Sequence, residues 1–180
     1  MFITKLKNRL RDCCCQGWFS HMGKSERFDL NSCFKNTLER ETYLEAAQSR
    51  VYKTASARFR MGASRINGHR LRFLVVQNQR CCPFCVDTTE DESHVLFVCP
   101  MYGQLREKIP LPVYRGVSMK ERYCRLYNDP DDKTLLNMSR FIFIALKLRE
   151  SLTSEEPSSV FVKAHICLFV KVTICCFECL

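Results

Sequence analysis

Three cysteines and one histidine stand at a spacing that strongly restricts how this chain can fold. Cys82, Cys85, His94 and Cys99 form a C-x2-C-x8-H-x4-C array. Two cysteines separated by two residues can turn both sulfurs toward one ion, and a histidine with a third cysteine completes the tetrahedral shell that Zn2+ prefers. Because the protein then fills all four positions, none remains for a catalytic water. The array therefore predicts a structural zinc site.

The residues between the ligands fit a compact metal-binding loop. Thr89 and Glu92 have the spacing of a capping box that opens a short helix, and His94 falls inside that helix. Pro100 biases Cys99 away from helical geometry. This bias is useful because five residues of α-helix would turn the Cys99 sulfur about 140° away from His94.

Two alternatives to this ligand set remain open. Cys81 and Cys85 form a C-x3-C pair, although the C-x2-C spacing of Cys82 and Cys85 is the commoner one in zinc knuckles. The four residues could also have met by chance in a cysteine-rich chain. Against chance, an intracellular chain uses thiols for metal binding more often than for disulfides.

The charge of the chain favours an anionic partner. Its 180 residues contain 28 Lys and Arg against 19 Asp and Glu, which gives a net charge of +9. Nucleic acid is the first partner that such an excess predicts, and a membrane surface is the second. The length suffices for one domain, or for a small core with arms.

The sequence predicts an intracellular protein. The stretch up to Trp18 lacks the long apolar core and the small-residue cleavage site of a secretory signal. The 13 cysteines are odd in number and partly adjacent, unlike the framework of a secreted disulfide scaffold. We therefore expect reduced thiols and a location in the nucleus or the cytoplasm.

Three segments of the chain differ in pattern. Residues 1–30 are basic and interrupted by Gly and Ser, which predicts a loosely structured lead-in. Residues 31–150 show helical periodicity and form the predicted module, a mainly α fold with the zinc knuckle at 81–100 inserted between helices. Residues 151–180 combine a Ser/Glu/Pro linker with an apolar, cysteine-rich tail whose two lysines leave apolar runs too short for a membrane span. A membrane partner is therefore not expected.

Apolar spacing predicts the helices of the module. The longest segment with the helical period is Leu44–Gly62. Three shorter segments have the same period, namely Cys33–Leu38, Met101–Glu107 and Ser118–Tyr127. Asn67–Gly68 is a turn signal, and the alternation that follows it at Leu71–Val75 predicts a weak strand.

The last predicted helix is unusually apolar. Asp129 has the character of an N-cap residue and Pro130 of the first helical residue, in a helix that extends to about Glu150. Nearly every face of this helix is apolar, so it must be buried in a core or against a partner. We expect a partner, bound through residues 129–150, because three short helices and one knuckle leave this helix uncovered.

A run of basic residues without acids precedes the knuckle. Between residues 50 and 80 there are eight Lys and Arg and no Asp or Glu. A solvated helix face would mix both signs, whereas arginine suits bidentate phosphate contacts and stacking on bases. The acidic knuckle loop should lie outside such a binding face, and a merely solvated face is the alternative interpretation. The predicted nucleic-acid contacts are Arg58, Arg60, Arg65, Arg70, Arg72 and Arg80.

The order of these features resembles a known family. FKNTLERETYLEAA, the basic SARFRMGASRINGHRLRF and CPFC…DESHVLFVCPMYGQLR are together similar to the C-terminal region of the polyprotein of LINE-type non-LTR retrotransposons, which follows the reverse transcriptase. The likeness covers about residues 31–150 and is most specific at Glu92, His94, Phe97, Cys99 and Tyr102. It implies a Cys-Cys-His-Cys zinc element that holds template RNA or target DNA, with a reverse transcriptase domain as the partner of residues 129–150.

The polymerase itself is not expected in this chain. A reverse transcriptase needs two adjacent aspartates on a tight hairpin and a third carboxylate to hold two magnesium ions. Asp131–Asp132 is the only adjacent pair, and it falls in a predicted loop and helix cap. We therefore predict a non-catalytic, zinc-stabilised module that binds RNA or DNA. The alternatives are a zinc-stapled protein-interaction module and a degenerate retrotransposon-derived open reading frame.

Overall fold

The fold is mainly α, as the sequence predicts. A computed structural model of the chain describes residues 2–22, 41–47, 49–70, 80–85 and 87–154. Within these ranges an antiparallel bridge between Cys81 and Thr89 is the one β contact. The helical elements, in chain order, are α1 (Phe2–Met22), α3 (Thr42–Ala46), α4 (Arg50–Arg60), α5 (Asn67–Arg70), η3 (His94–Val98), η4 (Pro100–Tyr102), α6 (Gly103–Lys108), α7 (Met119–Tyr127) and α8 (Asp132–Ser154).

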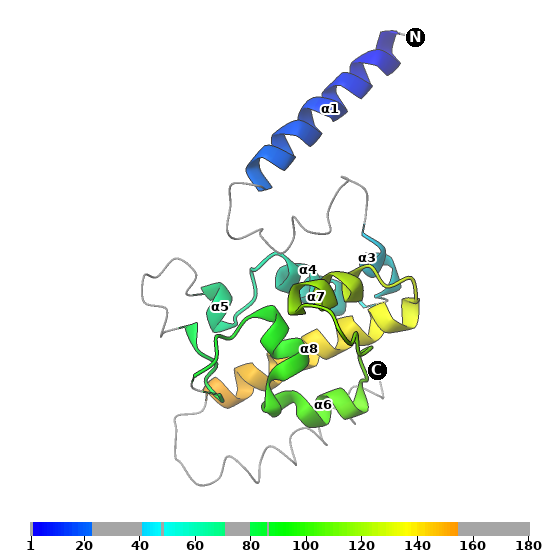
Figure 1. The fold of residues 1–180 in the computed structure, drawn as a ribbon. Coiled ribbons are helices and arrows are strands. Elements are labelled where there is room, and N and C mark those ends of the chain that lie inside the picture. Colours follow the sequence, from blue (N-terminus) through cyan, green and yellow to red (C-terminus); the bar gives the residue numbers. More distant parts are fainter. Residues whose placement is uncertain (1, 23–40, 48, 71–79, 86, 155–180) are drawn as a thin grey trace.

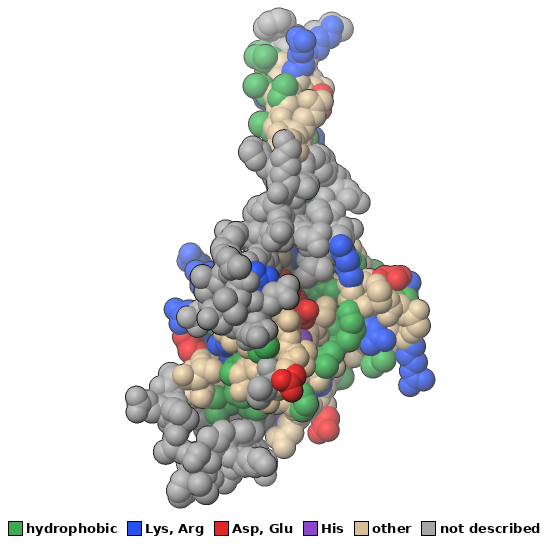
Figure 2. All heavy atoms as spheres, turned by 60° about the vertical axis from the view of Figure 1, so that its left-hand side comes forward, with side chains coloured by type: hydrophobic (Ala, Val, Ile, Leu, Met, Phe, Trp, Pro, Cys, Tyr) green, Lys and Arg blue, Asp and Glu red, His purple; other side chains and the backbone are tan. Residues whose placement is uncertain are grey.

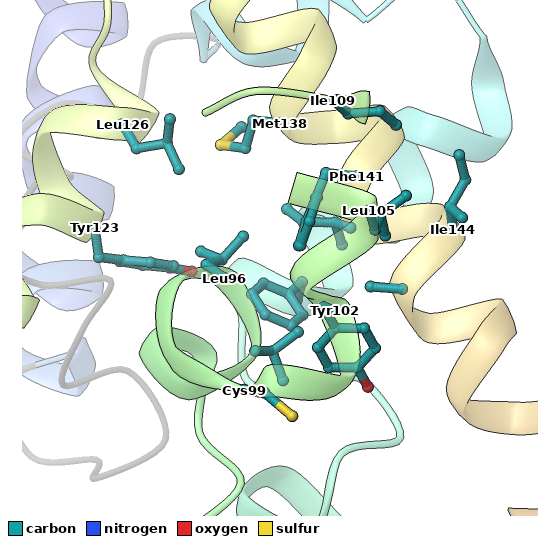
Figure 3. Packing of buried hydrophobic residues seen from close by; sticks show 14 of the residues in the cluster. Leu96, Cys99, Tyr102, Leu105, Ile109, Tyr123, Leu126, Met138, Phe141 and Ile144 are labelled. Carbon is teal, nitrogen blue, oxygen red and sulfur yellow. The ribbon is translucent and has the colours of Figure 1, made fainter. Parts of the chain in front are cut away.

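The longest helix, α8, forms the centre of the core. Helices α3, α4, α6 and α7 all pack against it (Figure 1). Met138, Phe141 and Ala145 on α8 are fully buried. Tyr102 meets Phe141 nearly edge to face at a ring-centroid distance of 6.5 Å, and Leu105 from α6 points into the same cluster (Figure 3). The expectation that the other helices leave α8 uncovered is therefore wrong, because segments from both sides of the knuckle cover it.

The start of α8 also differs from the prediction. The side chain of Asp131 accepts hydrogen bonds from the backbone N–H groups of Lys133 and Thr134 at 3.3 and 3.0 Å, which makes Asp131 the N-cap residue. Asp129 instead accepts the Asp131 N–H at 2.9 Å, in a turn before the helix. At its other end α8 continues to Ser154, across the predicted boundary at residue 150.

The predicted helix Leu44–Gly62 forms as two helices. Ala47, at the end of α3, has an extended backbone with φ −72° and ψ 105°. Part of the apolar stripe faces the core, since Ala47 and Phe59 are fully buried, whereas Val51 is 49% exposed. Gly62 ends α4 with a φ of 61°, and its N–H bonds the carbonyl of Phe59 at 3.2 Å. A glycine suits this left-handed helix end because it has no Cβ.

The predicted loosely structured lead-in contains a helix. Phe2–Met22 form α1, and Gly17 does not interrupt it, because one glycine within a helix costs only about 1 kcal/mol relative to alanine. Ile3, Leu6 and Leu10 are exposed, and hydrophobic side chains line one side of α1 while Lys and Arg occupy another (Figure 2). Among the residues that the structure describes, no helix combines the length and apolarity needed to cross a membrane.

Three further predictions fall outside the described residues. They are the short helix at Cys33–Leu38, the strand at Leu71–Val75 and the apolar tail beyond residue 154. The other two short helices are confirmed as η4 with α6, and as α7. Ser118 caps α7 by accepting the N–H of Glu121 at 3.2 Å.

Candidate metal centre

The structure brings the four predicted ligands together. The potential ligand atoms of Cys82, Cys85, His94 and Cys99 all lie within 4.8 Å of one another. The sulfurs of Cys82 and Cys85 lie 3.9 and 3.7 Å from the Cys99 sulfur. Two sulfurs bound at about 2.3 Å in a tetrahedral shell would lie about 3.8 Å apart, so the cluster has the dimensions of a metal site.

A short loop closed by backbone hydrogen bonds positions Cys82 and Cys85. The N–H of Cys82 bonds the carbonyl of Thr88 at 2.7 Å, and the N–H of Cys85 returns to the carbonyl of Cys82 at 3.3 Å. The resulting turn points both sulfurs to one side. Cys81 is not a member of the cluster and instead forms the bridge with Thr89. The geometry therefore matches the C-x2-C spacing rather than the C-x3-C alternative.

A π-helical turn places the other two ligands. The N–H of Cys99 bonds the carbonyl of His94 at 2.8 Å, the i to i+5 bond of a π-helix. This wider turn returns Cys99 to the side of His94, which an α-helix would not do. Cys99 itself leaves the helix with φ −56° and ψ 120°, as expected before a proline. The capping prediction is wrong in detail, because Asp91 rather than Thr89 accepts the His94 N–H, at 2.7 Å.

His94 fits a metal ligand better than an ordinary core residue. Its side chain is buried, yet neither ring nitrogen has a hydrogen-bond partner among the residues that the structure describes. Buried polar atoms nearly always have a partner, and a metal ion would supply one. Burial also lowers the pKa of His94, which favours the neutral imidazole that metal binding requires.

The sulfurs of the cluster favour a cation in their midst. Burial raises the pKa of Cys82, and it raises the pKa of Cys99 to about 12. Charge repulsion from Cys85 adds to the shift of Cys82, and repulsion from Cys82 and Cys85 adds to the shift of Cys99, because thiolates repel one another. A bound divalent ion would offset this repulsion. Four protein ligands close the shell, so the chemistry that the arrangement supports is structural.

Glu90 ties the metal-binding loop to two distant elements. Its carboxylate accepts hydrogen bonds from Arg149 on α8, from Nε at 2.6 Å and from Nη2 at 2.8 Å, and from the N–H of Asn67 at 2.6 Å. Glu90 is 0% exposed and Arg149 is 5% exposed. The predicted turn at Asn67–Gly68 is instead the start of α5. There the Gly68 N–H bonds the Glu90 carbonyl at 2.9 Å, and a Cβ on Gly68 would lie 2.4 Å from that oxygen.

Glu92 makes a second buried connection. Its carboxylate contacts Nε2 of His69 at 2.6 Å, and Nδ1 of His69 contacts the hydroxyl of Ser64 at 2.6 Å. All three residues are buried. Glu90 and Glu92 are therefore buried pairing residues, and they add no exposed charge to the acidic knuckle loop. Arg149 follows the buried Ile142 and Ala145 at helical spacing on the apolar side of α8, and this position was the available signal of a buried ion pair.

The predicted nucleic-acid contacts separate into exposed and buried arginines. Arg58 on α4 is exposed. The side chain of Arg65 is 80% exposed and pairs with Glu150. Arg80 is half-buried. The side chain of Arg70 and all of Arg72 lie outside the described residues.

Arg60 is wrongly predicted as a nucleic-acid contact. Its side chain is 2% exposed and pairs with Glu41 at 2.5 Å. The guanidinium also lies over the rings of Tyr43 and Tyr127, at 5.2 and 5.5 Å from their centroids. Helical periodicity explains this position, because Arg60 lies four residues, about one turn, after the buried Ser56 on α4. Arg60 therefore belongs to the core.

Comparisons of the chain with models of known protein families, with curated proteins and with solved structures find no match.

Proposed function

We propose that this chain is a zinc-stabilised nucleic-acid-binding module with no catalytic role of its own. Zn2+ suits the cluster because three thiolates and one imidazole in a closed tetrahedral shell are typical of structural zinc sites. The ion would join the turn at Cys82 to the π-helical turn at Cys99. It would thereby hold residues 81–100 as one layer against α8.

One observation carries the nucleic-acid part of the proposal. Arg50 and Arg58 project from α4 into solvent, and among the described residues neither makes an ion pair. Arg65 lies nearby and, within the described part of the chain, its ion pair is with Glu150, in an exposed contact that contributes little stability. Unpaired cations on one side of a folded helix are typical of a surface that binds an anion.

The resemblance to the C-terminal region of LINE-type retrotransposon polyproteins supports the same proposal. It suggests that the anion is template RNA or target DNA. A reverse transcriptase domain, if it binds residues 129–150, would meet only the outer side of α8, because Phe141 and its neighbours face the core.

Fluorescence anisotropy with a labelled oligonucleotide tests the proposal. We expect the affinity of the zinc-loaded chain to fall steeply as salt rises. Changing Arg50, Arg58 and Arg65 to Gln should weaken binding and make the slope of log K against log salt shallower by about 2 units, since each phosphate contact contributes roughly 0.7 to 0.9. A triple variant with the wild-type slope would show that these arginines are not the contacts.

The matched control removes positive charge elsewhere. Arg115 lies before α7 and Arg125 lies on it; both are exposed, and Arg125, like Arg65, forms an exposed ion pair, in this case with Glu121. Changing both to Gln should alter the salt slope little. If this control loses affinity as much per charge as the α4 variant, binding follows net charge and α4 carries no specific site.

A further inference from the structure

A groove between α4 and α8 is not explained by the metal centre. Its volume is about 450 Å3. One wall is α4 and the other is the second half of α8, two helices that pack side by side (Figure 1). Its end is formed by Ala63–Arg65, the segment that follows α4. The groove is lined by positions one turn apart on each helix, so it follows the helix axes.

The rim of this groove is strongly basic. Arg50, Arg58, Arg65 and Lys147 line it, together with Glu150 as the only acid. That carboxylate is already shared, since it pairs with Arg65 and accepts a hydrogen bond from Lys147 at 2.9 Å. Arg50 and Arg58 lie eight residues apart on α4, or about 12 Å along the axis. A ligand with several anionic groups can engage both, whereas a single small anion cannot.

The floor of the groove is apolar. Val51, Ala55, Phe143 and Leu146 line it, and Val51 remains 49% exposed. The ring of Phe143 contacts that of Tyr52 at a centroid distance of 5.4 Å, which fixes its orientation. A ligand that fills the groove must therefore combine an apolar, flat part with several negative charges. A nucleic acid strand has both, in its bases and its phosphates.

We propose that this groove binds single-stranded nucleic acid, with an unpaired base against Phe143 and Leu146 and the flanking phosphates on the basic rim. The inference rests on the proposed function and specifies its ligand. In a duplex the bases are stacked inside and present only their edges, so a duplex could contact the rim but would leave the floor empty. A single strand can place a base face on an aromatic side chain, and arginines along the same groove can follow its backbone.

The test compares one oligonucleotide of about 12 nucleotides as a single strand and as a blunt duplex, both labelled, by anisotropy at fixed salt. Wild-type protein should prefer the single strand. Phe143→Leu keeps an apolar side chain but removes the ring, and it should weaken single-strand binding about tenfold while leaving the weaker duplex binding unchanged. Val51→Glu places an acid at an exposed floor position, and it should weaken single-strand binding without loss of fold.

Fold and site effects are separated by controls. Far-UV circular dichroism and zinc content should be the same for both groove variants as for the wild type. Arg115→Gln with Arg125→Gln should keep the preference for the single strand. If Phe143→Leu proves unstable, the exposed Val51→Glu variant alone decides the question.

Four outcomes would contradict the inference in distinguishable ways. Equal affinity for both forms, with Phe143→Leu neutral, would leave the proposed function standing and remove the single-strand site. Single-strand binding that neither groove variant weakens would do the same and place the site elsewhere. No binding of either form at low salt would overturn the proposed function as well. Binding of an acidic amphipathic helical peptide, sensitive to Val51→Glu, without any oligonucleotide binding would replace both proposals by protein docking.

Discussion

The buried pair between Glu90 and Arg149 gives the sharpest test of how the metal-binding loop is held. Changing Glu90 to Gln keeps the shape of the side chain but leaves the guanidinium of Arg149, 5% exposed, without a counter-charge. Removing one partner of a buried ion pair costs about 3 to 5 kcal/mol. We expect the lower part of this range, because Gln retains one oxygen for the N–H of Asn67, which now bonds the carboxylate at 2.6 Å.

A double-mutant cycle isolates the interaction. Arg149→Met should also cost about 3 to 5 kcal/mol, since it leaves the Glu90 carboxylate buried and unpaired. The double variant contains no unpaired buried charge at this position, so it should be less destabilised than the sum of the two single variants by at least about 2 kcal/mol. Arg149→Lys is a milder probe: it keeps the charge but not the paired geometry of the guanidinium.

Urea unfolding of the zinc-loaded chain, followed by circular dichroism, measures these free energies. The midpoint should shift while the m-value stays constant, because the folded and unfolded surfaces are unchanged. Additive single variants, with a coupling energy under about 0.5 kcal/mol, would refute the argument. In that case water, and not the partner side chain, would solvate the two groups.

Three other perturbations follow from the same geometry. Cys85→Ser should abolish stoichiometric zinc binding while Cys81→Ser retains it, as measured by metal content after gel filtration; equal loss in both would contradict the cluster. Gly68→Ala should destabilise the chain by about 1 to 3 kcal/mol because its Cβ would lie 2.4 Å from a backbone oxygen, whereas Gly103→Ala meets nothing within 4 Å and should be neutral or stabilising in thermal melts. Phe141→Ala should cost about 3 to 5 kcal/mol in urea unfolding, and a cost under about 1 kcal/mol would mean that this ring is not in the core.

The metal cluster could be predicted from sequence because its determinants are local. All four ligands fall within residues 82–99, and a two-residue spacing or a following proline restricts backbone geometry directly. The partners that hold the cluster are not local. Arg149 lies 59 residues from Glu90 in the chain, so only the tertiary fold reveals their pairing. The π-helical turn is similarly rare, and no periodicity in the sequence indicates it.

For the arginines, by contrast, the sequence predicts less of what the structure shows. Composition predicts a basic surface but cannot say which face of α4 each residue occupies. Arg58 and Arg60 differ by two positions, which on a helix corresponds to about 200° of rotation. One is exposed, and the other lies beneath Tyr43 and Tyr127. The chain also breaks into two helices at Ala47, and a continuous stripe from Leu44 to Gly62 does not indicate such a break.

The apolar side chains around α8 connect the stability of the fold with the candidate metal site. The sequence suggests a missing protein partner for this helix, and the structure supplies a cover from the chain itself. Part of that cover is the segment that the metal closes: Leu96 and Cys99 are fully buried, and Tyr102, three residues after Cys99, packs on Phe141. A metal ion bound at this cluster would therefore substitute for core that so short a loop cannot provide alone.

Chelation of the metal tests this dependence. Without the ion, the loss of its four bonds to the protein, together with the unpartnered nitrogens of His94, should release residues 81–102 and expose the adjoining face of α8. We expect increased fluorescence of the dye ANS and self-association in sedimentation, both reversed by added Zn2+. Gly103→Ala, which leaves the cluster intact, should respond as the wild type does. An apo chain that remains monomeric, binds no dye and unfolds at the same urea concentration as the loaded chain would show that α8 is covered without the metal.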